Sequence, residues 1–421
     1  MRIQRTLAPT AAPLAVHDLL HGLAGIFLGE KQLMKLEGEI QDYFRVKHVF
    51  LVSSGKAALT LILVALKSLS SRQHVVIPAY TCFSVPSAIV KAGLNVSLCD
   101  VDPQSLDFNF DCLQSLIDAN PLCVIPTHLL GLPSNVDRVK GLCQDKGVFV
   151  VEDVAQAMGV KHGGRFLGTR GDVAFFSLGR GKNITCGSGG IIVTNCDLIA
   201  QALRKEYQRL TPEPTLGIIR NFCEVLALCL LIDPRLYWLP AGLPFLRLGE
   251  TKFYHDFPIH RMDGVRASLL SRWKDRLLES NASHSKVAAD FHDRLPRGCQ
   301  VVARVLEAKV LYNRMPVMMR SKRDKDELVA ASKANGLGIS PLYPSAIPDI
   351  EELKGSFMKG RFPAAEQVVN CLVTLPIHQF VRPKDVERIC CLVGQLHEAA
   401  EKAGMSSDSR SLASKSASVQ V

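Results

Sequence analysis

Residues 148–194 read VFVVEDVAQAMGVKHGGRFLGTRGDVAFFSLGRGKNITCGSGGIIVT and contain three short apolar runs. The runs have the length and the β-branched and aromatic content of buried strands: 148–152, 174–177 and 190–194. Asp153 follows the first run, Ser177 ends the second, and Lys182 lies shortly afterwards in a glycine-rich loop. Because ligands of parallel sheets bind beyond the carboxyl ends of strands, this stretch predicts both a sheet and a site.

The same alternation of apolar runs and helical patterns extends upstream to about residue 48. Further strands are predicted at 48–52, 74–77, 96–101 and 122–126, and helices at 56–69, 84–92 and 135–146. Strands that alternate with helices form a mainly parallel sheet covered by helices on both faces. We therefore expect an α/β fold, with a large domain at residues 1–265 that carries the site.

The C-terminal part has a different pattern. Residues 266–295 predict one long amphipathic helix. Strand patterns follow at 309–312 and 316–319, and helical patterns at 325–335 and 383–403. We expect these elements to form a smaller α+β domain at 266–405, linked to the large domain by the long helix. The tail at 406–421 has seven serines in sixteen residues and is expected to be disordered.

Composition narrows the class of protein. Of the 421 residues, 47% are hydrophobic and 21% charged, which excludes a mostly disordered chain. The thirteen cysteines form no C-x-x-C pair, so neither a zinc ribbon nor a thioredoxin motif is supported, and no metal site is predicted. With no secretory leader pattern at the start, they favour a reducing, cytoplasmic location. The net charge of +10 favours anionic partners, but no nucleic-acid-binding module is present, so no nucleic-acid partner is expected.

An unusually apolar segment lies within residues 210–256. The run Val225–Ile232 is wholly apolar but far shorter than the ~20 residues that a membrane span needs, and Tyr237 and Trp238 follow it. Two interpretations stay open. The segment could be an inserted hairpin buried in an oligomer interface. Residues 222–248 could instead rest on a membrane surface, at the inner face, with the aromatic rings at the headgroup level.

Asp153 and Gln156 follow a fully apolar strand. A carboxylate at such a place is costly unless a cation or hydrogen-bond donors satisfy it. One suitable partner is the protonated ring nitrogen of pyridoxal 5'-phosphate, which needs a carboxylate to keep the ring an electron sink. The alternatives are a helix cap or a ligand of Mg²⁺, and this stretch alone does not decide among them.

Two further features point to the same chemistry. Lys182 could form a Schiff base with a cofactor aldehyde, because the flanking glycines allow close approach, or it could be an ordinary surface lysine. The turn SSGKAAL at 53–59 opens a helix, whose free amides and dipole favour a phosphate. Ser54 there could serve as a helix cap without any ligand.

The order of these features resembles the DegT family of sugar aminotransferases, which are fold-type-I pyridoxal phosphate enzymes. The resemblance runs from about residue 15 to 400, apart from 210–256. It rests on the following motifs: SSGKAAL (53–59), PAYTCFSVPSAIVKAG (78–93), DVDP (100–103), PTHLLG (126–131), VEDVAQAMG (151–159), GTRGDVAFFSLGRGKNITCGSGG (168–190), HRMDGVRA (260–267) and LPIHQ (375–379).

The resemblance implies a role for each candidate residue. Lys182 would form the Schiff base and then carry a proton, and Asp153 would hold the ring nitrogen protonated. Gln156 would contact the ring oxygen. The phosphate would be bound by the turn and the second strand end, at Ser54, Gly55, Lys56 and Ser177. Substrate contacts are implied less directly for four further residues: Tyr80, His128, Arg261 and His378.

Three departures from the family pattern concern the same site. Cys82 stands where the family usually has an aromatic residue that stacks on the cofactor ring, and Tyr80 or Phe83 could substitute. Lys56 replaces a common threonine in the phosphate turn. Ile259 replaces an asparagine that often reaches the phosphate of a neighbouring subunit.

The implied activity is transfer of an amino group from an amino acid, glutamate in the first instance, to a nucleotide-linked keto-sugar for cell-surface or exopolysaccharide biosynthesis. A homodimer is implied as well. A few relatives that dehydrate sugars have histidine in place of the lysine, so Lys182 favours transamination. Another pyridoxal phosphate reaction on a sugar, such as dehydration, and a non-catalytic regulatory role remain the alternatives.

Overall fold

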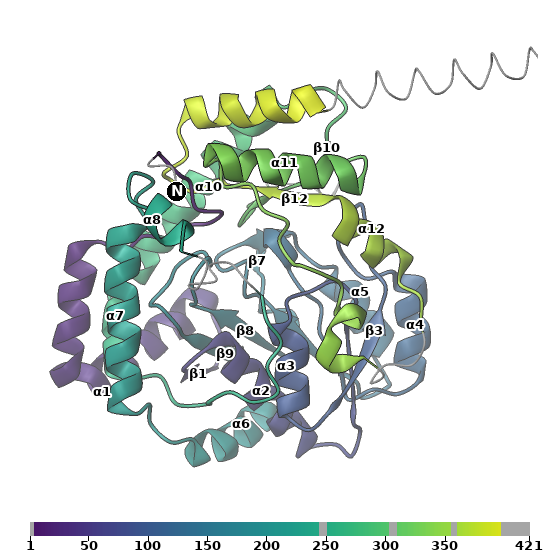
Figure 1. The fold of residues 1–421 in the computed structure, drawn as a ribbon. Coiled ribbons are helices and arrows are strands. Elements are labelled where there is room, and N and C mark those ends of the chain that lie inside the picture. The colour runs from purple at the N-terminus through teal and green to yellow at the C-terminus, as the bar shows by residue number, and fades with distance from the viewer. Residues whose placement is uncertain (1–3, 244–250, 303–309, 355–359, 397–421) are drawn as a thin grey trace, which may run out of the picture.

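The computed structural model describes residues 4–243, 251–302, 310–354 and 360–396. Its larger part is a seven-stranded sheet in the order β1-β9-β8-β5-β4-β2-β3 (Figure 1). The strands have the following bounds: β1 His48–Val52, β2 His74–Pro78, β3 Asn95–Cys99, β4 Cys123–Val124, β5 Phe149–Asp153, β8 Val173–Ser177 and β9 Gly190–Thr194. All neighbouring pairs are parallel except the two that β9 makes, with β1 and β8. The predicted α/β fold is confirmed.

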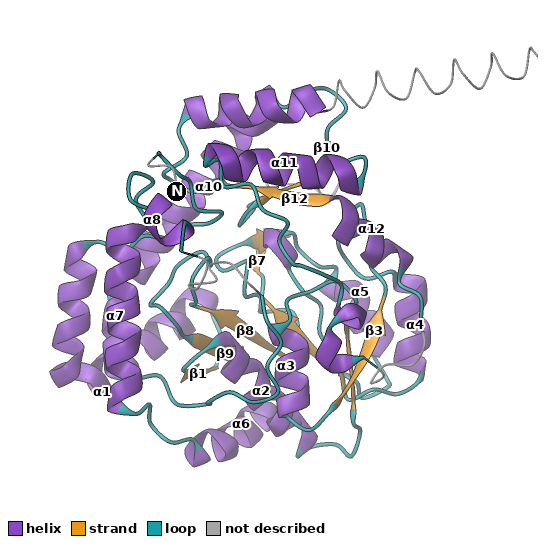
Figure 2. Cartoon of the chain, in the orientation of Figure 1, coloured by secondary structure: helices purple, strands orange, loops and turns teal. Residues whose placement is uncertain are grey.

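Helices cover both faces of this sheet (Figure 2). They include α2 (Gly55–Lys67), α3 (Ser84–Lys91), α4 (Phe110–Asp118), α5 (Val136–Cys143) and α6 (Asp197–Arg209). Successive strand residues point to opposite faces, as the pleat requires. Val75 and Ile77 pack in the core that contains α2 and α3, whereas Val76 packs in the core that contains α4 and α5. Burial on both faces explains why the strands appear as continuous apolar runs.

The C-terminal part forms a second, three-stranded antiparallel sheet in the order β10-β11-β12. Its elements are β10 (Gln300–Val301), β11 (Met315–Met318), α11 (Lys322–Asn335), α12 (Pro363–Cys371) and β12 (Leu372–Leu375), and a further helix spans 383–396. Figure 1 shows α11 and β12 above the seven-stranded sheet. The boundary predicted at residue 265 stays a prediction, and the serine-rich tail at 406–421 lies outside the described residues, as does residue 309 of a predicted strand.

The single long helix predicted at 266–295 is wrong. The segment forms two helices, α9 (Gly264–Leu269) and α10 (Trp273–Arg294). The backbone leaves helical geometry between them, at Leu270 and Arg272. Gly264, the first residue of α9, lies directly against Gly25 and Gly29 of α1 (Val16–Phe44).

The apolar segment within 210–256 is helical where the structure describes it, and both interpretations of it stay predictions. Helix α7 spans Thr215–Leu231 and α8 spans Trp238–Ala241, while residues 244–250 lie outside the described part. Figure 1 shows α7 beside α1. Both helices leave large apolar side chains exposed: Val16, Leu20, Ile26, Phe27, Leu216, Ile219 and Leu230. Among the described residues, no helix combines the length and the hydropathy that a bilayer crossing requires.

The N-terminal arm, residues 4–8, contacts the C-terminal part rather than the sheet. The Arg5 guanidinium binds the Asp385 carboxylate at 2.7 Å, and the Leu7 amide donates to the Gly336 carbonyl. The Ala8 carbonyl lies 2.8 Å from Nε2 of His378. The arm therefore connects the first described residues to the C-terminal part of the molecule.

Candidate active site

Asp153 is the last residue of β5, and its side chain is buried. Its Oδ1 accepts a hydrogen bond from the Ala155 amide at 2.9 Å, and no described residue binds its Oδ2. Burial raises the pKa of Asp153 above the ordinary value, although the Ala155 amide, Lys182 and His128 act against the rise. The carboxylate thus keeps one oxygen for a cationic or hydrogen-bonding ligand.

Lys182 lies in the loop after β8 and is half-buried. Burial lowers its pKa below the ordinary value of lysine, and the nearby Arg314 guanidinium acts in the same direction. Cys82 and Asp153 act in the opposite direction. A lowered pKa increases the fraction of free amine, the form that attacks an aldehyde or accepts a proton.

The turn at residues 53–59 opens helix α2, as its sequence predicts. Ser54 caps α2 and accepts from the Ala57 amide at 3.1 Å. The first amides of a helix have no acceptor within it, so those of Gly55 and Lys56 remain available to a ligand. A Cβ at Gly55 would lie 2.8 Å from Cβ of Ser177. Only glycine therefore lets the turn approach the end of β8 so closely.

Lys56 adopts a position that the sequence did not suggest. Its Nζ lies 4.3 Å from the ring centroid of Tyr254 and 4.6 Å from that of Phe257. Burial lowers the pKa of Lys56, and Cys82 counteracts the shift. Cys82 is half-buried and close to both Lys56 and Lys182. The aromatic contacts hold the ammonium beside the turn, where it adds positive charge.

Gln156 connects the two parts of the molecule. Its Nε2 donates to the Tyr343 hydroxyl at 2.9 Å, and its Oε1 accepts from the Leu130 amide at 2.9 Å. The rings of Tyr343 and Tyr80 are 5.4 Å apart, and both residues are buried. The Tyr80 hydroxyl is buried without a hydrogen-bond partner, which marks it as a donor available to a ligand.

His128 does not face a substrate, contrary to the prediction. It is fully buried, its Nε2 lies 3.0 Å from Oε2 of Glu152, and its Nδ1 accepts from the Ser134 amide. Glu152 also accepts from the amides of Gly168, Arg170 and Gly171. Both imidazole nitrogens are therefore occupied, and the pair fixes the loop before β8. Sequence reasoning missed this pair because 24 residues separate the partners.

Arg261 and His378 are likewise engaged by protein atoms. The Arg261 guanidinium donates to the carbonyls of Tyr207 and Gln208, and the nearby Asp263 carboxylate pairs with Arg266. His378 is buried, with Nε2 on the Ala8 carbonyl and Nδ1 unpartnered. Burial lowers the pKa of His378 to about 4, so its imidazole is neutral near pH 7. The substrate roles predicted for both residues remain without support in their contacts.

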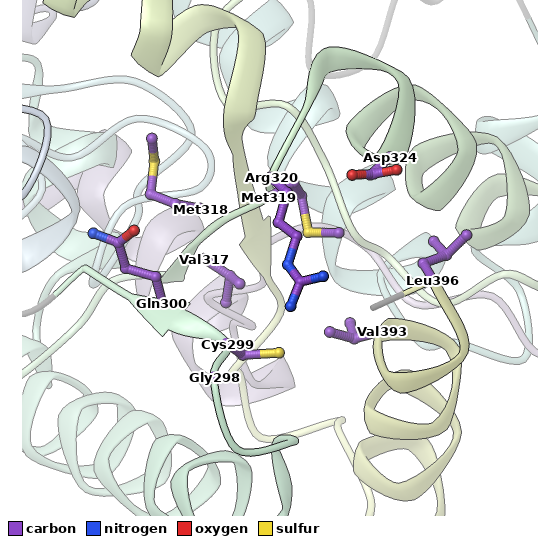
Figure 3. A pocket seen from close by; sticks show the side chains of 10 residues that line it. All are labelled: Gly298, Cys299, Gln300, Val317, Met318, Met319, Arg320, Asp324, Val393 and Leu396. Atoms are coloured by element: carbon purple, nitrogen blue, oxygen red, sulfur yellow. The ribbon is translucent and has the colours of Figure 1, made fainter. Parts of the chain in front are cut away.

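A cavity of about 100 Å³ lies elsewhere, between β10, β11 and the helix at 383–396 (Figure 3). Cys299, Arg320 and Leu396 are among the residues that line it, and none of the candidate site residues does. Its volume is far below the ~300 Å³ of the smaller ligand pockets. The site at the strand ends is therefore the better candidate for chemistry.

Comparison with known families decides the assignment. The family model described as the DegT/DnrJ/EryC1/StrS aminotransferase family matches residues 15–211 and 250–393. The chain belongs to this family. The interval that the family model leaves unmatched contains α7 and α8.

Similar proteins of the DegT family act on nucleotide-linked sugars. GDP-perosamine synthase from Vibrio cholerae is 31% identical over 169 residues, which cover 40% of this chain and 46% of that protein. The structure resembles Helicobacter pylori PseC, an aminotransferase of pseudoaminic acid biosynthesis, with a TM-score of 0.75 at 16% identity; the match covers 94% of this chain and all of the other. It also resembles E. coli GDP-4-keto-6-deoxy-D-mannose-3-dehydratase with bound hydrated PLP (TM-score 0.71, 16% identity, coverage 93% and 100%). At these identities the structural matches establish the fold.

Pyridoxal 5'-phosphate, the cofactor of DegT-family aminotransferases, fits the residues present. The turn and Ser177 suit a phosphate, Asp153 has a free oxygen for a ring nitrogen, and Lys182 provides the amine. The glycine contact at the turn and the free Oδ2 are the two structural observations that support the fit. The predicted cofactor residues thus lie together at one edge of the sheet, although they come from separate segments of the sequence.

Proposed function

We propose that this DegT-family protein transfers an amino group from an amino acid, with glutamate as the first donor to test, to a nucleotide-linked keto-sugar. One observation carries the proposal: Lys182 lies in the loop that follows β8, and β8 pairs in parallel with β5, which ends at the buried carboxylate of Asp153. A basic amine next to a carboxylate beyond the strand ends is the arrangement that amino transfer needs.

The chain's own residues divide the work. Ser54, Gly55 and Ser177 hold the phosphate at the start of α2, where the helix dipole favours an anion. Asp153 would hold the ring nitrogen of the bound cofactor protonated, and Gln156, which donates to the Tyr343 hydroxyl, would contact the same ring. The Nζ of Lys182 would accept and return a proton at the substrate carbon. Bound pyridoxal phosphate supplies the electron sink that this proton transfer requires.

Dehydration of a sugar is the alternative within the same fold. A dehydratase is among the structural neighbours, although at 16% identity. The presence of Lys182 favours transamination over the dehydrations that use histidine at this position. The products of a reaction with a keto-sugar and glutamate distinguish the two: an amino-sugar supports the proposal, and a deoxy-keto-sugar contradicts it.

The first experiment is the visible absorption spectrum of the purified protein mixed with pyridoxal phosphate. We expect a band that borohydride removes and that glutamate bleaches. Lys182→Ala should lack the band, whereas Lys286→Ala, which changes an exposed lysine, should keep it. Absence of the band in the unchanged protein would refute the cofactor assignment, and a band that no amino acid bleaches would refute amino transfer.

We also propose a homodimer in which the exposed apolar faces of α1 and α7 are covered by a second copy. Monomers rarely expose so many neighbouring large apolar side chains, and Phe27 is 88% exposed. Phe27→Ser with Leu230→Ser should shift the mass measured by light scattering toward the monomer. If the double variant keeps the mass of a dimer but no longer binds lipid vesicles, the result would support the membrane-surface alternative instead.

A further inference from the structure

We propose that Arg314 is the anion-binding residue of the active site and that it takes the α-carboxylate of the amino donor. The inference rests on the proposed function, since it names how the donor is recognised. Arg314 precedes β11 in the C-terminal part, and the family resemblance did not single it out. Three features of Arg314 support this role: its contacts, its place beside the Lys182 loop and the tyrosine hydroxyl groups near it.

The guanidinium of Arg314 lacks an anionic partner. It is half-buried, and its one hydrogen bond to a described residue is donated from Nη1 to Oγ of Ser340 at 3.1 Å. No carboxylate among the described residues pairs with it. Burial lowers the pKa of Arg314, as expected for a cation that water solvates poorly. A cation held in this way is stabilised when an anion arrives, because burial of an unpaired charge is costly.

The neighbouring residue fixes Arg314 against the Lys182 loop. The Asn313 amide donates to the Leu130 carbonyl at 2.8 Å, and its Nδ2 donates to the Gly181 carbonyl at 3.2 Å. A Cβ placed on Gly181 would lie 3.8 Å from Nη2 of Arg314. The guanidinium therefore lies next to the residue that precedes Lys182, and its position is set before any substrate binds.

Three tyrosine phenols act electrostatically on the Arg314 guanidinium: Tyr343, Tyr237 and Tyr80. Tyr80 is buried with an unpartnered hydroxyl, and Tyr343 lies beside it with its hydroxyl on Gln156. Burial raises the pKa of both phenols, so both stay protonated and able to donate. The phenol of Tyr237 also lies near Arg314 and is kept protonated by burial. A cation with phenolic donors around it is suited to a carboxylate or a phosphate.

The chemistry of the substrates favours the carboxylate. In an amino acid the α-carboxylate is attached to the carbon that bears the amino group, so it must lie within a few ångströms of the reacting amine. In a nucleotide-linked keto-sugar the sugar ring separates the diphosphate from the keto carbon. A cation adjacent to the Lys182 loop is therefore in position to bind the α-carboxylate rather than the diphosphate. A donor without the α-carboxylate should be a poor substrate.

The experiment measures binding and the two half-reactions separately. Calorimetry with glutarate, a dicarboxylate without an amino group, reports carboxylate binding by the protein with and without pyridoxal phosphate; pyrophosphate serves as the diphosphate probe. We expect Arg314→Met to weaken glutarate binding about 30-fold or more and Arg314→Lys about tenfold, since lysine keeps the charge but loses the planar pair of donors. Pyrophosphate binding should stay unchanged. Arg297→Met, an exposed control, should match the unchanged protein.

The kinetic arm should agree. Bleaching of the cofactor band by glutamate should slow by the same factor in Arg314→Met, whereas the reaction of the aminated form with a keto-sugar should be unaffected. The inference is overturned if the unchanged protein does not bind glutarate, or if Arg314→Met binds it within about twofold of normal while circular dichroism shows an intact fold. Loss of pyrophosphate binding alone would overturn the carboxylate assignment. Failure of every amino acid to bleach the band would refute the proposed function, and calorimetry would still test Arg314.

Discussion

The two acidic residues that end β5 have opposite surroundings. Glu152 is fully buried, and four hydrogen-bond donors satisfy its carboxylate: the His128 imidazole and the amides of Gly168, Arg170 and Gly171. Asp153, the next residue, points to the other side of the strand and receives one hydrogen bond. The same strand thus places a fully hydrogen-bonded carboxylate on one side and, on the other, a carboxylate with one oxygen free to bind a ligand.

The number of hydrogen bonds that each carboxylate receives distinguishes a structural carboxylate from a ligand-binding one better than burial does. Both side chains are buried, so exposure does not distinguish them. A buried polar group with all its hydrogen bonds made inside the protein has nothing left for a ligand, whereas one with an open position requires a partner from outside. Two further groups of the candidate site share this property among the described residues: the Tyr80 hydroxyl and the Arg314 guanidinium are also incompletely partnered. We therefore expect substitutions on the two sides to affect different measurements.

The largest expected effect is on the Asp153 side. Asp153→Asn should lower the rate of amino transfer roughly 10³-fold, because the amide cannot stabilise a protonated ring nitrogen. Its apo form should unfold at the same or a higher temperature, since burial raises the pKa of Asp153 and its ionised form destabilises the fold near neutral pH. Product analysis and thermal unfolding measure the two quantities. A large fall in the melting temperature would contradict the comparison.

On the Glu152 side the expected effect is on stability. Glu152→Gln should lower the free energy of unfolding by about 3 kcal/mol, because it replaces a buried carboxylate that accepts four hydrogen bonds with an amide whose NH₂ group faces donors. Urea unfolding measures this loss. The activity per folded molecule should stay within about threefold of normal. If the variant is stable but inactive, the division between the two sides fails.

The pH dependence sharpens the same comparison. Burial alone would raise the pKa of Glu152, but the hydrogen bonds from His128, Gly171 and Gly168 outweigh it and hold the pKa below the ordinary 4.5. A carboxylate with a lowered pKa stabilises the fold fully above its unfolded value and loses this contribution as the pH falls through its folded value. The difference in unfolding free energy between the unchanged protein and Glu152→Gln should therefore be constant from about pH 7 to 6 and shrink below 4.5. A difference that grows on acidification would contradict the assigned sign.

The smallest expected effect concerns the link between the two parts. Tyr343→Phe removes the hydroxyl that accepts from Gln156 and leaves the ring packing with Tyr80 in place. The loss of one such hydrogen bond costs about 1 kcal/mol, so the affinity for pyridoxal phosphate should fall about fivefold. Titration of the visible band measures the affinity. An effect below about 1.5-fold would show that Gln156 reaches its position without Tyr343.

Much of the large part of the molecule was predictable from local pattern. Strands β1 and β9 have the predicted bounds, and β5 and β8 differ by one residue, because burial on both faces requires unbroken apolar runs. Helix α1 gave no usable signal, since many of its apolar side chains are exposed and obscure the periodicity. The break between α9 and α10 was also missed, and the close packing of Gly264 on α1 is a tertiary contact that local pattern does not show.

The candidate site shows the same limit of prediction from local sequence pattern. Asp153, Gln156, Ser177 and Lys182 follow strands directly, so topology alone brings them together. Arg314 and Tyr343 come from the C-terminal part, and nothing around them in the sequence indicates that they approach Lys182. His128 was assigned to the wrong side because its partner Glu152 was read only as part of a strand. Such contacts depend on how distant segments pack, which local pattern does not encode.

The N-terminal arm has a consequence for the order in which this chain matures. Arg5 binds Asp385 across 380 positions, and Ala8 binds His378 across 370. A ribosome that adds about 5–20 residues each second needs roughly 20–75 s to reach those partners after the arm has emerged. The arm lacks these two contacts throughout that interval, while the central sheet, whose last strand ends at Thr194, already has all its strands. We expect nascent chains halted before residue 378 to be cut near Arg5 by trypsin, and the released protein to resist it there.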